Sequence, residues 1–274
     1  MLFLDMGVEN WLYFSIIKVN TFDQLQFDMN LKDLQKNWDK FGREDPYWAI
    51  ITEADKKGNK WTDEEFFLTG QHQADRIVKQ FKRTCRNQAL SKAVDFGCGA
   101  GRVTQGLANH FEEVHGVDIA PSMIKLAKEK SQKANCHFHL NEQNDLQLFE
   151  DQQFDLVFSI ITLQHMQPKY AKNYIREFFR ILKPGGMMMF QIPSKPDRGT
   201  QLYHKVPSPL KGIKSMLGSK KEEAIMEMYW INISEMTEFL QSLGGQIHRI
   251  LRDDSAGEGW DSFTYSVGLR PSEE

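Results

Sequence analysis

Hydrophobic positions change their spacing along the chain, and the change separates two regions. From about residue 61 onward, segments with apolar residues at helical spacing alternate with short, continuous apolar segments. The first helical segment opens with the capping-box sequence TDEE at residues 62–65, and its apolar residues recur at helical spacing up to Phe81. Helices and strands in alternation predict an α/β fold built on a layered sheet.

The short apolar segments give the predicted strands. They cover residues 92–96, 113–117, 136–140, 154–159, 187–192, 247–251 and 263–269. Only a loop separates the last two, so we expect that pair to be antiparallel. The predicted fold is therefore α/β, with a three-layer, Rossmann-like seven-stranded sheet that is mostly parallel, an antiparallel last strand, and helices on both faces.

Two segments stand outside this alternation. Residues 1–60 do not share it, and we interpret them as an N-terminal arm and a helical lid, with no function assigned to residues 1–28. Residues 61–274 form the main domain. A stretch rich in Pro, Gly, Lys and Ser at about residues 193–231 interrupts it and predicts an insertion on the substrate side.

Composition excludes several classes of protein. The 274 residues are 41% hydrophobic, which excludes a disordered chain, and the net charge of -3 argues against a nucleic-acid binder. No apolar stretch reaches the roughly 20 residues of a membrane-spanning helix, so no membrane insertion is expected. Acidic residues before the first apolar run fit a signal peptide poorly. Three cysteines without a C-x-x-C pair favour a reducing, cytoplasmic setting.

The sequence offers no evident metal site. His137 and His139 form a pair on one face of a predicted strand, with no third ligand nearby in the sequence. Oligomeric state is open between a monomer and a homodimer.

The most informative segment is AVDFGCGAGRVT, residues 93–104, in which a strand ends in Gly97-x-Gly99-x-Gly101 and a helix follows at once. Glycine allows positive φ and close approach of a ligand to the backbone. Asp118 ends the next strand, where it can accept hydrogen bonds from a ribose diol. Two ligand classes fit this arrangement: a dinucleotide, or an adenosyl amino acid.

Four motifs in order resemble the class I S-adenosylmethionine-dependent methyltransferases of the small-molecule type, over about residues 66–269. They are VDFGCGAGRVT, VDIAPSMIKLAK, FDLVFSIITLQHM and LKPGGMMMFQIP. The resemblance implies S-adenosylmethionine as cofactor and methyl transfer to the oxygen or nitrogen of a small-molecule acceptor. The alternative is a non-catalytic module of the same fold that binds S-adenosylmethionine.

The resemblance also implies cofactor-binding residues. Asp95, Gly97, Cys98 and Gly99 would hold the methionine part, Asp118 the ribose, and Ile119 and Met123 the adenine. After the third strand, Glu142 aligns with the acid that reads the adenine edge, with Gln143 beside it and Asp145 as the second choice. Ser159, at the end of the fourth strand, would lie beside the sulfonium.

The acceptor side depends on parts outside the shared core. Aromatic residues in the two outlying segments are the candidates: Trp38, Tyr47, Trp48, Tyr203 and Tyr229. The alternative is that those near residues 38–48 form a small satellite core. A hydroxyl acceptor would need a base, and His165 is the histidine best placed by sequence to remove its proton. A packing or helix-capping role is the alternative for His165.

Overall fold

A computed structural model describes residues 30–86, 88–196 and 224–269 of the chain. Its strands form one seven-stranded sheet in the order β3-β2-β1-β4-β5-β7-β6. The strands are β1 (Lys92–Phe96), β2 (Glu113–Asp118), β3 (Cys136–Leu140), β4 (Phe154–Ser159), β5 (Leu182–Pro196), β6 (Gly245–Asp253) and β7 (Trp260–Leu269). Neighbours among β1 to β5 pair in parallel, whereas β7 pairs antiparallel with both β5 and β6.

The predicted fold class is therefore confirmed, with differences at the boundaries. β5 begins at Leu182 rather than at residue 187, so the LKPGG segment is part of the strand. The helix before it, α6 (Pro168–Ile181), still ends where that segment begins. The last helix, α9 (Ile233–Ser242), has Asn232 at its N-cap position, and this residue makes no side-chain cap hydrogen bond.

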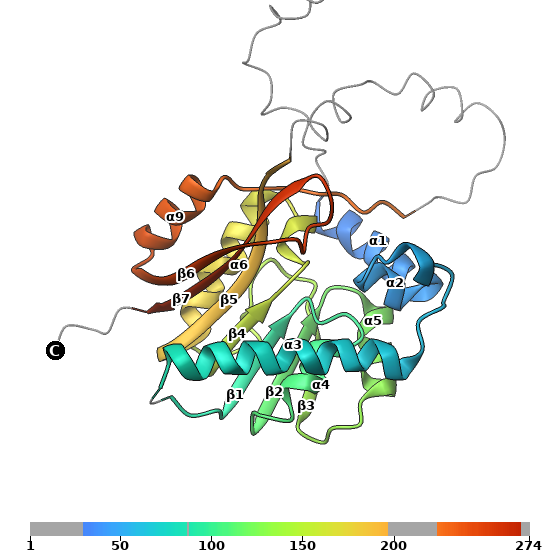
Figure 1. Ribbon diagram of the computed structural model, residues 1–274, viewed down its shortest axis with the longest axis horizontal. Coiled ribbons are helices and arrows are strands. Elements are labelled where there is room, and N and C mark those ends of the chain that lie inside the picture. Colours follow the sequence, from blue (N-terminus) through green and yellow to red (C-terminus); the bar gives the residue numbers. More distant parts are fainter. Residues whose placement is uncertain (1–29, 87, 197–223, 270–274) are drawn as a thin grey trace, which may run out of the picture.

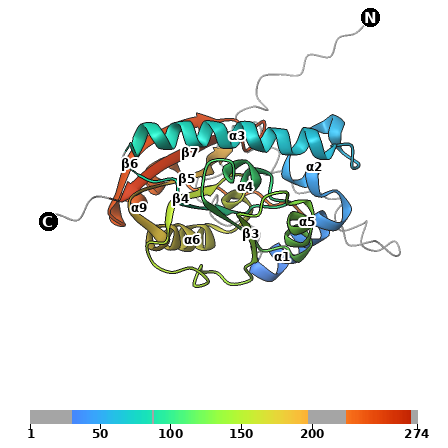
Figure 2. The ribbon, with the colours of Figure 1, turned by 90° about the horizontal axis from the view of Figure 1, so that it is seen from below.

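Helices cover the two faces of the sheet. On one face, α3 (Asp63–Thr84) and α4 (Arg102–Leu107) pack against alternate strand residues such as Ala93 and Leu156. On the other, α6 and α9 pack against the intervening residues, including Val94 and Val157. Figure 2 shows α3 and α6 on opposite sides of the strands. This alternation places buried apolar side chains on both faces of the central strands, as a covered parallel sheet requires.

The longest helix begins as its sequence predicts. The Thr62 hydroxyl accepts from the Glu65 backbone N–H at 3.2 Å, and the Glu65 carboxylate accepts from the Thr62 N–H at 3.2 Å. This reciprocal capping box satisfies two backbone donors that the first turn would otherwise leave open.

The N-terminal helices pack over the end of the sheet where β2 finishes. They are α1 (Leu31–Glu44) and α2 (Pro46–Ile50), followed by the 3₁₀ turn η3 (Ala54–Lys56). Asp39 on α1 accepts from the backbone N–H of Ser122 at 2.9 Å, at the start of α5 (Pro121–Lys130). Gln35 donates to the Ile119 carbonyl at 3.2 Å. Figure 1 shows α1 and α2 beside α5.

Part of the predicted insertion belongs to the described residues. Residues 224–231 have no regular secondary structure and run from α1 to the end of β5. At one end the Ile225 N–H donates to Asn37 Oδ1 at 3.0 Å, and at the other the Ile231 N–H donates to the Pro193 carbonyl at 3.0 Å. We call residues 224–231 the strap.

Candidate cofactor site

The glycine loop between β1 and α4 forms one wall of a cavity. Gly97 and Gly99 have φ of 78° and 53°, in the left-handed region that favours glycine. A Cβ atom on Gly97 would lie 2.0 Å from Thr162 Oγ1, and one on Gly99 would lie 2.6 Å from Ile50 Cδ1. The loop therefore has no space for side chains, because the turn after β4 and helix α2 pack directly against it.

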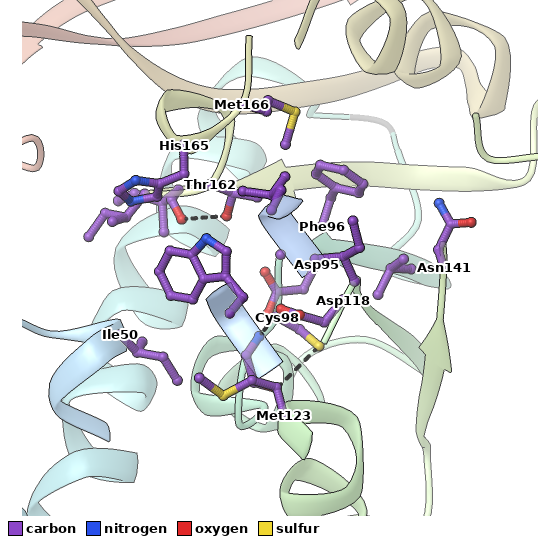
Figure 3. Close-up of a pocket in the computed structure, with 18 of the residues that line it drawn as sticks. Ile50, Asp95, Phe96, Cys98, Asp118, Met123, Asn141, Thr162, His165 and Met166 are labelled. Atoms are coloured by element: carbon purple, nitrogen blue, oxygen red, sulfur yellow. Dashed lines mark hydrogen bonds between the residues drawn. The ribbon is translucent and has the colours of Figure 1, made fainter. Parts of the chain in front are cut away.

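The cavity lies at the carboxyl ends of β1, β2 and β4. Helix α1 closes it from above with Leu31, Leu34 and Trp38, which are spaced to share one face of the helix. Figure 3 shows Asp95 and Asp118 in the middle of the cavity, with Met166 and Met123 on opposite sides.

Two carboxylates from neighbouring strands enter this cavity. Asp118 accepts from the Gly99 N–H and from the Ala120 N–H, each at 2.9 Å. Burial raises its pKa, and these backbone hydrogen bonds oppose the rise. Asp95 accepts from the Thr104 hydroxyl at 2.7 Å. Burial raises the pKa of Asp95 to about 6, against the hydrogen bond from Thr104 and the charge of Arg102.

Most of the predicted cofactor residues meet here. Asp95, Gly97, Cys98, Gly99, Asp118, Ile119 and Met123 all line the cavity. Their meeting follows from topology, since the ends of parallel neighbours β1 and β2 lie at the same edge of the sheet.

Three other predicted cofactor residues lie off the wall. Glu142 and Gln143 are exposed, and Glu142 accepts a hydrogen bond from Gln35 on α1. Asn141, the first residue after β3, lines the cavity in their place. Its amide donates to the carbonyls of Gln143 and Asp145, so it closes the turn that directs Glu142 outward.

Ser159 is the third. It is buried at the end of β4, and its hydroxyl has no hydrogen-bond partner among the described residues. The wall beside it is made by the next three residues, Ile160, Ile161 and Thr162. Ile161 has a φ of 54°, so the chain turns sharply at this point and brings these side chains to the cavity.

Of the predicted acceptor residues, too, some line the cavity and others do not. Trp38 lines the cavity. Tyr47 instead stacks on Phe66 with ring centroids 4.0 Å apart, in the satellite cluster that was the alternative interpretation. Trp48 donates from its indole to the Glu53 carbonyl at 3.0 Å and lies off the cavity wall.

The remaining two aromatic candidates belong to the predicted insertion. Tyr229 is buried in the strap, and it too is absent from the cavity wall. Tyr203 lies outside the described residues. Helical periodicity would have found two residues that the sequence analysis missed, Leu31 and Leu34, because they precede Trp38 on one face of α1.

His165 lines the cavity from the 3₁₀ turn η4 (Leu163–His165) and is 2% exposed. Its ring lies against Trp38, with centroids 5.0 Å apart. Burial lowers the pKa of His165 to about 4, opposed by a hydrogen bond to the Glu227 carbonyl. The imidazole is therefore neutral at physiological pH.

The histidines of β3 have a neighbour that the sequence analysis did not anticipate. His115 on β2 contacts His139 through their ring nitrogens at 2.9 Å and Glu113 at 2.8 Å. Burial lowers the pKa of His139 to about 4. Within the described part of the chain, no group of three or more potential ligands has an arrangement that could hold a metal ion.

Comparison with known proteins places this site in a family. A family model described as a methyltransferase domain matches residues 93–186. A demethylmenaquinone methyltransferase from Staphylococcus carnosus is 30% identical over 169 residues, which cover 58% of this chain and 68% of that protein. A demethylmenaquinone methyltransferase from Leptospira interrogans is 29% identical over 140 residues, 49% of this chain and 55% of that protein.

Among solved structures, magnesium protoporphyrin IX methyltransferase from Synechocystis with bound SAH has a TM-score of 0.59 at 17% identity, covering 88% of this chain and 100% of that chain. The fold and the cavity define a nucleoside-binding α/β domain of the methyltransferase type. Together with the relatives, they show that this chain belongs to the class I S-adenosylmethionine-dependent methyltransferases. The chain spans about half the length of the first curated relatives that it matches, 55% in the case above.

The predicted cofactor is that of the family, S-adenosylmethionine, and the residues present fit it. Gly97, Cys98 and Gly99 line the cavity, so a ligand there can contact the backbone of the loop. Asp118 accepts from backbone N–H groups of the loop, and a carboxylate has lone pairs left over for hydroxyls. No helix among the described residues is both long and apolar enough to cross a bilayer.

Proposed function

We propose that the protein transfers the methyl group of S-adenosylmethionine to an oxygen or nitrogen atom of a small-molecule acceptor. The observation that carries the proposal is the meeting of the glycine loop and two buried carboxylates in one cavity covered by helix α1. When bound, S-adenosylmethionine supplies a methyl group on a positively charged sulfur, and the electrons of the S–CH₃ bond return to that sulfur on transfer.

At the cofactor end of the cavity, carboxylates would bind the polar groups of S-adenosylmethionine, and apolar side chains would contact its adenine. Asp118 would accept from the ribose hydroxyls, and Asp95 would face the ammonium group of the methionine part. Ile119, Met123 and the Asn141 amide line the part nearest β2 and β3, where the adenine would lie. Glu142 and Gln143 would act from outside the wall, through the contact of Glu142 with Gln35.

The acceptor end would lie between α1 and the turn after β4. Its described wall is apolar and aromatic, with Trp38, Ile161 and Met166 beside Thr162 and His165. The chain's contribution here is to hold the acceptor close to the methyl group and to exclude water, which accelerates a bimolecular reaction by orientation alone. The demethylmenaquinone methyltransferases among the relatives are named for a small-molecule acceptor, and the apolar and aromatic wall agrees with an acceptor of that kind.

The test has two stages. Calorimetric titration with S-adenosylmethionine should show saturable binding, and the absence of heat at high concentration would refute the proposal. Incubation with panels of phenols, quinols and amines should then release S-adenosylhomocysteine with a subset of them. Binding without any such release would favour the non-catalytic module instead.

A further inference from the structure

A row of buried polar side chains connects the cavity wall to the strap. It runs from Ser262 on β7 through Gln191 on β5 to Gln164 and His165 in η4, and these side chains are 0%, 1%, 3% and 2% exposed. Gln191 Nε2 lies 2.7 Å from Ser262 Oγ and 3.0 Å from Gln164 Oε1, and Gln164 Nε2 lies 3.2 Å from His165 Nε2. Buried polar groups at this density need every partner satisfied.

Two backbone groups set the direction of every hydrogen bond in this row, one beside Gln191 and the other beside His165. The Ile161 N–H can only donate, and it donates to Gln191 Oε1 at 3.0 Å. The Gln191 amide nitrogen therefore faces Gln164 Oε1, and the Gln164 amide nitrogen donates to His165 Nε2. At the other end, the Glu227 carbonyl can only accept, so the proton of His165 is on Nδ1, 2.7 Å away.

Both ends thus assign the same neutral tautomer to His165, with a proton on Nδ1 and a lone pair on Nε2 that Gln164 occupies. A general base needs a free lone pair within reach of the acceptor. The ring of Trp38 lies against the imidazole, and the nearby Glu227 carboxylate accepts from the Tyr229 hydroxyl. Burial, which lowers the pKa of His165 to about 4, favours this neutral form.

His165 instead connects structural parts that are distant in sequence. Its Nδ1–H binds the strap at Glu227, and the adjacent Gln164 carbonyl accepts from the Tyr229 N–H at 2.7 Å. Its ring supports Trp38, which covers the cavity from α1. Through Gln191, the same row holds the strained turn at Ile161.

We propose that His165 is a positioning residue and not the general base: its Nδ1–H holds the strap, and its ring supports Trp38 at the cavity wall. This inference rests on the proposed methyl transfer. Gln164 and Gln191 are then positioning residues for the same reaction.

Two substitutions distinguish a positioning role of His165 from a role as general base. In His165→Asn, the amide nitrogen takes the place of Nδ1–H and can still donate to Glu227, whereas His165→Ala cannot. We expect His165→Asn to keep kcat within about threefold of the wild type, and His165→Ala to lose on the order of tenfold or more. A general base would be lost equally in both variants, and equal losses would overturn the proposal.

Two readouts do not depend on turnover. Hydrogen exchange across residues 224–231 should accelerate in His165→Ala and less in His165→Asn. In the ¹⁵N-histidine-labelled full chain, the His165 signals, assigned by their loss in His165→Asn, should show the Nδ1–H tautomer and no titration between pH 5 and 8. The Nε2–H tautomer, or titration near pH 6.5, would overturn the proposal even if methyl transfer is confirmed.

A substitution at Gln191, which does not contact His165, tests the direction of the hydrogen bonds in the row. When its carboxyl is ionised, Gln191→Glu has no group that donates to Gln164, so the Gln164 amide must turn over and present its carbonyl to His165 Nε2. Both ring nitrogens would then face acceptors, which favours the imidazolium and should raise the pKa of His165. Ser262→Ala is the matched control, because Ile161 still sets the Gln191 orientation, and the pKa of His165 should stay low. If the pKa of His165 stays unchanged in Gln191→Glu at a pH where infrared spectroscopy shows the new carboxyl to be ionised, the assigned hydrogen-bond directions are wrong.

The two proposals fail in different ways. If S-adenosylmethionine does not bind, the proposed function fails while the tautomer and the exchange data still report on His165. If methyl transfer is observed but His165→Asn and His165→Ala lose activity equally, the positioning role fails and the function stands.

Discussion

Substitution of Asp118 tests the cofactor assignment most directly, because the structure shows how its oxygens are used. The Gly99 N–H and the Ala120 N–H each take one acceptor position at 2.9 Å. A carboxylate offers roughly four positions, so lone pairs are left for ribose hydroxyls. Each hydrogen bond to a charged group contributes about 1.5–3 kcal/mol. Loss of one such bond therefore corresponds to about a 10- to 150-fold loss of affinity.

Asp118→Asn should lose about one ribose hydrogen bond, because its amide nitrogen replaces one accepting oxygen. The same nitrogen must also face a backbone N–H, so the variant should be less stable by about 1–3 kcal/mol. Asp118→Ala removes both ribose contacts and should bind S-adenosylmethionine more weakly still. Calorimetry measures the affinity for S-adenosylmethionine. Thermal unfolding without ligand measures separately how much the substitution destabilises the protein at the glycine loop.

A pair of ligands distinguishes contact with the ribose from damage to the loop. S-adenosylhomocysteine and its 2′-deoxy analogue should differ in affinity for the wild type, and the difference should shrink in Asp118→Asn. A coupling of this kind between side chain and hydroxyl is what a double-mutant cycle measures. If Asp118→Asn discriminates between the two ligands as well as the wild type does, Asp118 serves only the glycine loop and the assignment to the ribose is wrong.

Two further predictions concern Asp95 and the glycine loop. Burial raises the pKa of Asp95 to about 6, so its carboxyl becomes ionised as the pH rises through that value. Because an ammonium group binds the ionised form, the affinity for S-adenosylmethionine should increase from pH 5 to 7 in the wild type and stay constant in Asp95→Asn. The same pH dependence of affinity in both proteins would contradict the role of Asp95. Gly97→Ala should lower the free energy of unfolding by about 1–2 kcal/mol because of the positive φ at this position. The clash of the new Cβ, 2.0 Å from Thr162 Oγ1, should lower it further. Gly244→Ala, with a φ of 80° and open space around it, is the control that bears the backbone cost alone. Equal melting temperatures and affinities for these two variants would show that the close approach at Gly97 is unimportant.

The sequence was sufficient for the parts of the site that local pattern determines. Asp95 and Asp118 each lie in or at the end of a short apolar strand, and parallel pairing of β1 with β2 brings those ends together. The glycines between them mark the turn that a ligand can approach. Neither inference requires knowledge of contacts beyond a single βαβ unit.

The choice between neighbouring residues after β3 could not be made from the sequence. The predicted strand ended at the right residue, Leu140, yet the wall is formed by Asn141 and not by Glu142. The Asn141 side chain closes a turn on the carbonyls of Gln143 and Asp145, and this turn points the next residues outward. A one-residue difference of this kind depends on turn geometry, which residue type alone does not determine.

Aromatic residues gave the least reliable prediction because their partners are distant in sequence. Tyr47 and Trp38 lie in adjacent helices and have similar composition around them, but Tyr47 packs on Phe66 whereas Trp38 packs on His165. The difference is set by which helix face meets the sheet, and α1 presents Leu31, Leu34 and Trp38 together.

The same reasoning explains why the role of His165 changes between sequence and structure. In sequence it is a histidine six residues after a strand end, a position that suits a base. In the structure its two nitrogens are taken by Gln164 and by the Glu227 carbonyl, 62 residues away. A histidine's chemistry depends on which groups face its nitrogens. Gln164 is the neighbouring residue in η4, but Gln191 on β5 sets which of its amide atoms faces His165, and Glu227 belongs to the strap. The positioning interpretation therefore depends on contacts that are distant in sequence.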